Sequence, residues 1–191
     1  LRAPIEDGEV TITRAAGSIT LPSRFMLVGA MNPCRCGWYG HPSGRCRCTK
    51  QQVEKYVEKI SGPMLDRMDL HVNVPSVEFE AMRRREKAES SADVRARVNK
   101  ARERQKERFA GTNVACNAQM TPAMVGEYCT LDASGEKLLK SAFDRLGLTA
   151  RSHDRLLRVA RTIADLDGSE KIEAQHLAEA IQYRNTDILR G

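Results

Sequence analysis

The spacing of the apolar residues changes near Ser90, and this change divides the chain into two kinds of structure. Before Ser90, apolar residues alternate with polar ones or stand in short continuous runs, which is typical of β-strands. After it, they recur every three or four residues, which is typical of amphipathic helices. We therefore expect an α/β segment in residues 1–76, a basic connecting helix in residues 77–110 and an all-helical domain in residues 111–191.

The first segment carries several strand signals. Residues Glu9–Arg14 alternate in character and are followed by Ala-Ala-Gly-Ser, which predicts a hairpin whose second arm begins at Ile19. The continuous apolar run Phe25–Met31 is typical of a strand buried on both faces, and Leu70–Val74 predicts another short strand. A helix is expected over Gln51–Ile60.

The helical part carries clear start and stop signals as well as apolar stripes. The expected caps and stops are Ser90, Thr121, Asp132, Gly147 and Gly168. The residues expected to face a core are Val94, Val98, Ala101, Leu138, Leu139, Ala142, Leu146, Leu156, Leu157, Ala160, Ile163, Ala164, Ile172, Leu177 and Ile181.

Length and composition exclude several classes of protein. A chain of 191 residues with 41% apolar content can bury one ordinary core or two small ones. No stretch approaches the roughly eighteen consecutive apolar residues of a membrane span, and the first residues do not resemble a signal peptide. We expect a cytoplasmic protein with no membrane partner. Because the chain opens on Leu1 with a sequence typical of a domain interior, we also expect it to be part of a longer protein.

The formal net charge of +6 is concentrated in one segment. Residues 83–108 hold eleven Lys and Arg against five Asp and Glu, which leaves twenty of each for the rest of the chain. Such an excess can bind phosphate backbones or an acidic partner, and Arg102 and Arg104 are its candidate nucleic-acid contacts. The alternative is a solvated helix face that serves only solubility.

Three separated motifs carry polar side chains suited to a phosphate group. Asn32 ends an apolar run, where its amide could orient a water against a phosphate, although Asn-Pro is also an ordinary turn signal. Arg67 stands between Asp66 and Asp69, and its charged fork suits a phosphate as well as an ion pair with either aspartate. Arg151 begins a helix, where surface charge or a salt bridge is the alternative.

The order of these motifs along nearly the whole chain resembles one family. The segments LRAPIEDGEVTI with RAAG, AMNPC, GPMLDRMDLHV and ARSHDRLLRVARTIADL together resemble the ComM/YifB type of magnesium-chelatase-like AAA+ ATPases. The chelatase I subunit and the minichromosome-maintenance helicases are similar more distantly. The resemblance implies an α+β fragment of an α/β AAA+ core followed by an all-α helical lid domain, which is a helical bundle.

The resemblance also implies roles for single residues. Arg14 would lie near the tip of the pre-sensor-1 hairpin, which can project into a central pore, and would contact DNA. Asn32 would be sensor 1, and Arg67 the arginine finger that reaches the ATP of a neighbouring subunit. Arg151 would be sensor 2, with Arg155 one turn further as a weaker nucleotide contact. The implied cofactors are ATP and Mg²⁺, the implied assembly is a hexameric homo-oligomeric ring, and the implied partner is single-stranded or branched DNA.

The phosphate-binding loop of that family has no counterpart in the sequence. There is no Gly-x-x-x-x-Gly-Lys-Ser/Thr motif and no apolar strand ending in paired acids. Both are expected before Leu1, so the chain alone is expected not to hydrolyse ATP. The central strand of the family's sheet is also expected before Leu1, so the two predicted strands would not be neighbours. Residues from about 90 to 186 are then expected to be the self-sufficient unit.

Four of the six cysteines form two Cys-x-Cys pairs separated by nine residues: Cys34, Cys36, Cys46 and Cys48. Four thiolates supply the tetrahedral set that Zn²⁺ prefers, and nearby arginines favour the thiolate form. One-residue gaps are unusual, because they strain chelation by a single metal. Structural disulfides are rare in the cytosol, so the alternative to zinc is a reduced, metal-free loop. His41 is a substitute ligand.

Three functions remain open from the sequence. The first is a ring-forming, ATP-driven DNA motor for DNA uptake or recombination, such as branch migration, as the resemblance implies. The second is the ATPase subunit of a magnesium chelatase, which would drive magnesium into a porphyrin. The third is a non-enzymatic helical DNA-binding or adaptor module, for which the basic helix would be responsible.

Overall fold

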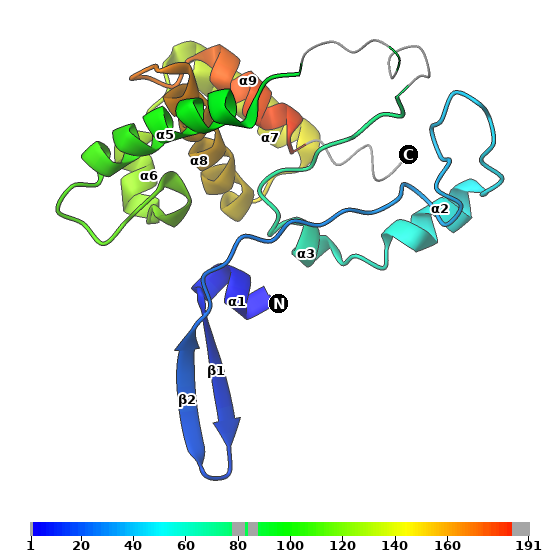
Figure 1. Ribbon diagram of the computed structural model, residues 1–191, viewed down its shortest axis with the longest axis horizontal. Coiled ribbons are helices and arrows are strands. Elements are labelled where there is room, and N and C mark those ends of the chain that lie inside the picture. Colours follow the sequence, from blue (N-terminus) through cyan, green and yellow to red (C-terminus); the bar gives the residue numbers. More distant parts are fainter. Residues whose placement is uncertain (1, 78–82, 84–87, 185–191) are drawn as a thin grey trace. The chain divides into compact units, whose positions relative to one another are not determined.

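The computed structural model describes residues 2–77, 83 and 88–184 (Figure 1). These residues form two compact units, one up to Met68 and the other from Asp69. The first unit contains α1 (Arg2–Asp7), β1 (Glu9–Arg14), β2 (Gly17–Pro22), α2 (Lys50–Val57) and α3 (Gly62–Leu65). The second contains α5 (Ser91–Arg108), the 3₁₀-helix η1 (Asn117–Gln119), α6 (Pro122–Tyr128), α7 (Ala133–Leu146), α8 (Ala150–Asp167) and α9 (Ala174–Gln182).

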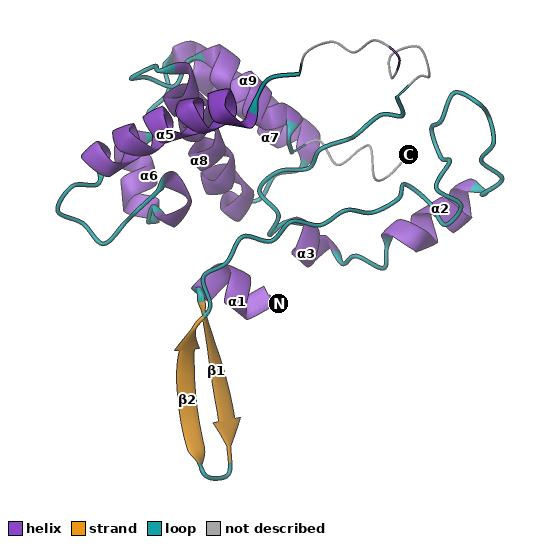
Figure 2. Ribbon diagram, in the orientation of Figure 1, coloured by secondary structure: helices purple, strands orange, loops and turns teal. Residues whose placement is uncertain are grey.

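The change from mixed structure to helices is visible along the chain (Figure 2). In the described residues, strands occur in the first unit and the regular elements of the second unit are all helical. An α+β segment followed by a helical domain is therefore confirmed. Among the helices that the structure describes, none has the length and apolar character that a bilayer crossing requires.

The predicted hairpin is present as β1 and β2. The two strands pair antiparallel from Glu9 opposite Pro22 to Arg14 opposite Gly17, so Arg14 lies at the tip. Gly17 has a φ of +140°, which L side chains rarely adopt and which accounts for a glycine at this position. The hydroxyl groups of Thr11 and Thr20 meet across the strands with their Oγ1 atoms 2.9 Å apart.

Two predicted strands are missing from the described structure. Residues Phe25–Met31 and Leu70–Val74 have no regular secondary structure, and their apolar side chains lie open to solvent. Met26 is 87% and Val74 82% exposed. The expectation of strands at these positions was wrong. A strand needs neighbouring backbone to satisfy its N–H and C=O groups, and among the described residues only β1 and β2 are paired in a sheet.

The predicted helix over Gln51–Ile60 is confirmed in a shorter form, as α2. Thr49 caps it in a reciprocal arrangement with Gln52. The Thr49 hydroxyl accepts a hydrogen bond from the Gln52 backbone N–H, and the Gln52 side chain accepts one from the Thr49 backbone N–H. Val53 is the buried residue of this helix. The capping box therefore fixes where the chain leaves the cysteine loop and becomes helical.

Helix α8 is the centre of the second unit, since α5, η1, α6 and α9 all pack against it. The buried apolar cluster comprises Phe109, Met120, Val125, Cys129, Leu139, Ala142, Leu156, Leu157, Ala160, Ala164, Ile172, Leu177, Ala180 and Ile181. Burying one such Leu or Ile side chain contributes about 1.5–3 kcal/mol to folding. The cluster lies wholly within the region expected to be self-sufficient.

The helix ends of this unit follow the predicted signals. Ser90, Thr121 and Asp132 each accept a hydrogen bond from a backbone N–H three residues further on. Gly147 (φ +59°) and Gly168 (φ +80°) end α7 and α8 in the left-handed conformation that favours glycine.

Helix α5 packs along only half of its length. Residues 91–100 are exposed, including Val94 and Val98 of the predicted apolar stripe. Ala101 and Gln105 are buried. The inward stripe was therefore wrong for the two valines and correct for Ala101, because only the second half of the helix lies on the bundle.

Arg108, at the end of α5, belongs to a buried polar network. Its guanidinium donates to both carboxylate oxygens of Asp165, at 2.8 and 2.5 Å, and to Oδ1 of Asn117 at 2.9 Å. Asn117 Nδ2 also donates to Asp165, and Arg161 Nε lies 3.2 Å from the same carboxylate. Burial alone would raise the pKa of Asp165, but the hydrogen bonds from Arg108 and Asn117 outweigh it and lower that pKa.

Candidate functional site

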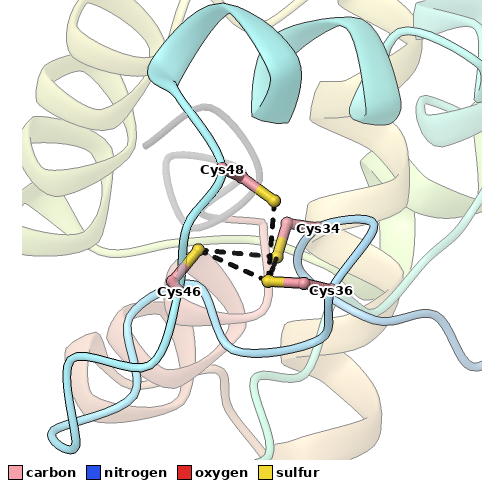
Figure 3. A group of neighbouring side chains, drawn as sticks. All are labelled: Cys34, Cys36, Cys46 and Cys48. Atoms are coloured by element: carbon pink, nitrogen blue, oxygen red, sulfur yellow. Dashed lines mark hydrogen bonds between the residues drawn. The ribbon is translucent and has the colours of Figure 1, made fainter.

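The four cysteines of the loop before α2 converge on one point. Figure 3 shows the sulfur atoms of Cys34 and Cys36 turned toward those of Cys46 and Cys48. All four Sγ atoms lie within 4.8 Å of one another. The Cys34–Cys36 distance is 3.3 Å, and the 36–48, 36–46 and 34–46 distances are 3.5, 3.6 and 3.8 Å. The structure thus brings together all four predicted metal ligands.

These separations match a tetrahedral metal site. Four sulfurs about 2.3 Å from a zinc ion occupy the corners of a tetrahedron whose edges are about 3.8 Å. The four distances of 3.3 to 3.8 Å agree with that edge within about half an ångström, and all six separations are at most 4.8 Å. They are far longer than the roughly 2.05 Å of a disulfide, and all four cysteines are free. The one-residue gaps are therefore compatible with chelation of a single ion.

Backbone N–H groups and neighbouring sulfurs divide the four thiols into two kinds. A hydrogen bond from the Trp38 backbone, together with that from the Cys34 thiol, lowers the pKa of Cys36 to about 6. Burial of Cys34 and its hydrogen bond with the Cys36 side chain would raise its pKa. Hydrogen bonds from the backbones of Tyr39 and Cys36 and from the Cys46 side chain outweigh these two effects, so the pKa of Cys34 is lowered.

The other two thiols are held in the neutral form. A hydrogen bond from the Cys48 backbone favours the thiolate form of Cys46. Desolvation and the side-chain hydrogen bonds with Cys36 and Cys34 outweigh it and raise the pKa of Cys46 to about 12. A hydrogen bond with the Cys36 backbone would lower the pKa of Cys48. The hydrogen bond with the Cys36 side chain and desolvation outweigh it, so the pKa of Cys48 is raised as well. Proximity of the sulfurs thus limits how many can be charged together, and a bound cation would relieve that limit.

His41 lies outside the group of four sulfurs. Its Nδ1 accepts a hydrogen bond from the Ser43 backbone N–H at 3.0 Å. Its ring packs edge-on against Trp38, with the ring centroids 4.9 Å apart. The four thiols therefore supply four candidate ligand atoms without this histidine.

Asn32 is exposed and stands two residues before Cys34. Its side-chain amide lies beside Gly37, since a Cβ placed on Gly37 would be 3.8 Å from Asn32 Cγ. Gly37 has a φ of +81° and follows Cys36 directly. The cysteine loop and the predicted water-orienting amide are thus parts of one local structure.

Arg67, directly after α3, is engaged within the first unit. Its Nη1 donates to the carbonyl of Pro63 at 2.6 Å, and its Nη2 to a Glu6 carboxylate oxygen at 2.5 Å. The Arg67 side chain is only 12% exposed. Sequence reasoning pointed to Asp66 or Asp69 as the carboxylate and missed Glu6, which is 61 residues away and has no local signal.

Arg151 and Arg155 lie in the first two turns of α8. Thr149 caps this helix by accepting a hydrogen bond from the Ser152 backbone, and the first turn contains no acidic residue. Exposed Arg151 thus stands at the positive end of the helix dipole, where an anion is favoured. Arg155 Nη1 donates to Asp69 Oδ1 at 2.9 Å, so it is paired within the second unit.

The three candidate nucleic-acid arginines come from two elements, the β1–β2 hairpin and α5. Arg14 is exposed at the hairpin tip. Arg102 is exposed on α5, whereas Arg104 is half-buried and its Nη2 lies 3.5 Å from the position of a Cβ on Gly168. Arg104 also lines a shallow groove with Arg97 and Lys100 beside the end of α8.

Comparisons with known proteins cover both units. The family model described as magnesium chelatase, subunit ChlI, matches residues 1–82, and the one described as magnesium chelatase, subunit ChlI C-terminal, matches residues 88–184. The uncharacterised YifB of Escherichia coli K12 is 42% identical over 190 residues, which are 99% of this chain and 36% of YifB. The competence protein ComM of Haemophilus influenzae is 40% identical over 185 residues, which are 96% of this chain and 35% of ComM.

A third relative, the uncharacterised Rv2897c of Mycobacterium tuberculosis, is 35% identical over 190 residues, or 37% of its own length. The chain thus spans about a third of the length of the curated relatives it matches. Two consecutive family matches and similarity to YifB along 99% of the chain confirm the resemblance seen in the motifs. The chain belongs to the magnesium-chelatase-like family, and within it is of the ComM/YifB type.

Proposed function

We propose that the chain is the C-terminal part of a ring-forming AAA+ ATPase that acts as a DNA motor in DNA uptake or recombination, such as branch migration. The observation that carries this proposal is the similarity to the competence protein ComM over 96% of the chain. Residues 1–76 would be the second half of the AAA+ α/β core, residues 77–110 the basic connection and residues 111–191 the helical lid. The packing of the second half of α5 on α8 supports a mechanical link between connection and lid.

In this proposal, ATP and Mg²⁺ supply the transferable phosphoryl group and the cation that neutralises it. Asn32 holds the attacking water through its amide. Arg67 inserts its planar fork at the γ-phosphate of a neighbouring subunit, which requires exchange of the Glu6 carboxylate for a phosphate. Arg151 binds phosphate where its charge and the positive end of α8 act together, and Arg155 supports it from the next turn.

The sequence contains no phosphate-binding-loop motif, so the 191-residue chain alone is expected not to hydrolyse ATP. The full-length protein is expected to hydrolyse ATP as a hexameric ring and to do so faster with single-stranded or branched DNA. Arg14 at the hairpin tip and Arg102 with Arg104 on α5 would contact the DNA phosphates.

The description of the matching family models favours a second candidate, the ATPase subunit of a magnesium chelatase. Such a subunit would share the nucleotide chemistry but would respond to a porphyrin and its partner subunits instead of DNA. A non-enzymatic helical DNA-binding or adaptor module would bind DNA without any nucleotide effect. The response of ATP hydrolysis to DNA separates the three.

The test is ATP hydrolysis by the full-length protein with and without branched DNA. Arg67→Ala is expected to lower kcat by about a thousandfold or more, which is typical of a lost arginine finger, and Arg145→Ala, an exposed arginine on α7, serves as the matched control. Changing Arg102 and Arg104 to Glu should weaken DNA binding and its salt dependence. A rate of ATP hydrolysis that does not change with DNA but rises with a porphyrin partner would favour the chelatase. ATP hydrolysis by the 191-residue chain would contradict the expectation that this chain cannot bind the ATP phosphates by itself.

We also propose that Cys34, Cys36, Cys46 and Cys48 hold one structural Zn²⁺, because their sulfur separations match a tetrahedral thiolate site. Chain purified without chelators is expected to contain about one zinc per molecule by elemental analysis. Cys46→Ser should abolish most of that content, whereas Cys116→Ser, outside the cluster, should not. Folded protein with no zinc would remove the proposal.

A further inference from the structure

The cysteine loop carries an exposed aromatic ring that the ATPase proposal does not use. Trp38 is the single tryptophan of the sequence and is 38% exposed. A tryptophan that served only to pack the loop would bury its large apolar surface. Its partly open ring is therefore available to a planar ligand.

Two neighbours hold this ring in place. The Arg45 guanidinium carbon lies 5.2 Å from the Trp38 ring centroid, in a cation–π contact. His41 packs edge-on against the same ring. The Trp38 backbone N–H also bonds the Cys36 sulfur, so the ring is anchored directly to the four-sulfur cluster of Figure 3.

The charged residues of the loop that carries this ring are all positive. Residues 34–53 contain Arg35, Arg45, Arg47 and Lys50 but no Asp or Glu. All four cations are exposed. A zinc ion with four thiolates has a net charge of about −2, which the four cations exceed. The loop therefore carries a net positive charge whether or not metal is bound, and one of its cations, Arg45, contacts the Trp38 ring.

We propose that this loop binds single-stranded nucleic acid, with an unpaired base stacked on Trp38 and backbone phosphates at Arg35, Arg45 and Arg47. Aromatic stacking flanked by cations is the combination that binds single strands without reading their sequence. A duplex keeps its bases stacked on each other and so cannot offer a free base face to the ring. The proposal deepens the DNA-motor function and rests on it, because it locates a strand contact in the same protein.

The test uses the 191-residue chain loaded with zinc and a labelled twenty-nucleotide oligothymidylate. Binding is followed by anisotropy of the label and, separately, by the emission of Trp38. We expect a saturable change in Trp38 emission that parallels the anisotropy, since a stacked base quenches the ring. Trp38→Ala should weaken binding by about 5- to 150-fold, the range for loss of one stacked base, whereas Trp38→Phe keeps an aromatic face and should weaken binding much less.

Charge and metal variants complete the experiment. Arg45→Gln should weaken binding and lower the slope of log affinity against log salt by about 0.7, the value for one single-strand phosphate contact. Arg145→Gln on α7 is the matched control and should leave both unchanged. The zinc content of each variant shows that the loop is intact, and removal of zinc by a chelator should abolish the Trp38 response until zinc is restored.

Two results would overturn the proposal. The first is unchanged Trp38 emission at oligonucleotide concentrations that saturate the anisotropy, which would place the strand elsewhere. If binding is then lost on changing Arg102 and Arg104 to Glu, the DNA-motor function stands and the loop contact alone fails. The second is an affinity for duplex equal to that for the single strand. Competition by oligouridylate distinguishes the source of the strand: equal competition indicates single strands of either kind, and weak competition indicates DNA.

Discussion

At Asp165, a buried carboxylate is held between two arginines and an asparagine that come from three different elements. Replacing it with Asn leaves the charges of the partly buried Arg108 and the buried Arg161 without their anion. We expect Asp165→Asn to lower the free energy of unfolding of the helical unit by about 3–5 kcal/mol, as is usual when one partner of a buried ion pair is lost. Urea unfolding followed by circular dichroism measures it. The exposed Asp144→Asn on α7 should change stability by less than about 0.5 kcal/mol.

The same residue gives the unit a defined acid dependence. Because the folded state lowers the pKa of Asp165, its contribution is complete above the unfolded value of about 3.9 and is lost as pH falls through the lower folded pKa. The stability difference between the original chain and Asp165→Asn should therefore shrink below about pH 4. An equal difference at pH 3 and pH 7 would mean that Asp165 does not titrate with folding.

At the scale of elements, two glycines distinguish the effect of backbone conformation on stability from the effect of side-chain packing. Gly147 ends α7 at φ +59°, whereas Gly126 lies inside α6, and a Cβ added to either would meet nothing within 4 Å. Gly147→Ala should destabilise the unit by about 1 kcal/mol, because alanine resists the left-handed region. Gly126→Ala should stabilise it by about 0.5–1 kcal/mol through helix propensity. Thermal unfolding of the two variants measures both changes, and shifts of the same sign would contradict the backbone explanation.

Whether an element could be predicted depended on where its partners lie. The β1–β2 hairpin and the caps at Ser90, Thr121 and Asp132 form between residues close in sequence, and their signals are local. The run Phe25–Met31 has the composition of a buried strand but finds no pairing among the described residues. The composition of a segment indicates that it can form a strand, but the strand forms only where another strand lies beside it and pairs with it.

At the scale of the whole chain, the two units hold themselves together in different ways. The helical unit has a large apolar cluster, whereas the buried apolar residues described in the first unit are Cys34 and Val53. We therefore expect slow amide exchange in α7, α8 and α9 and fast exchange over residues 25–31. Removing metal with a chelator should speed exchange in residues 34–57 and leave α7–α9 unchanged. Hydrogen exchange with mass spectrometry measures this, and strong protection of residues 25–31 would contradict the observed exposure.

The sequence by itself determined the hairpin, the capped helix ends of the helical unit, the apolar stripes of α7, α8 and α9, and the presence of two closely spaced thiol pairs. Each of these depends on propensity, capping or periodicity over a few neighbouring residues. It also carried the order of motifs that assigns the family, since that order is a property of the chain and not of its folding.

The tertiary structure alone decided how distant groups meet. It brought the Cys34 and Cys46 sulfurs to 3.8 Å, paired Arg67 with Glu6 and enclosed Asp165 between Arg108 and Asn117. It also left half of α5 and the run Phe25–Met31 in solvent. The physical reason is that ion pairs, metal sites and sheets require groups separated by tens of residues to come within contact distance. No local sequence pattern specifies which distant residue will be the partner.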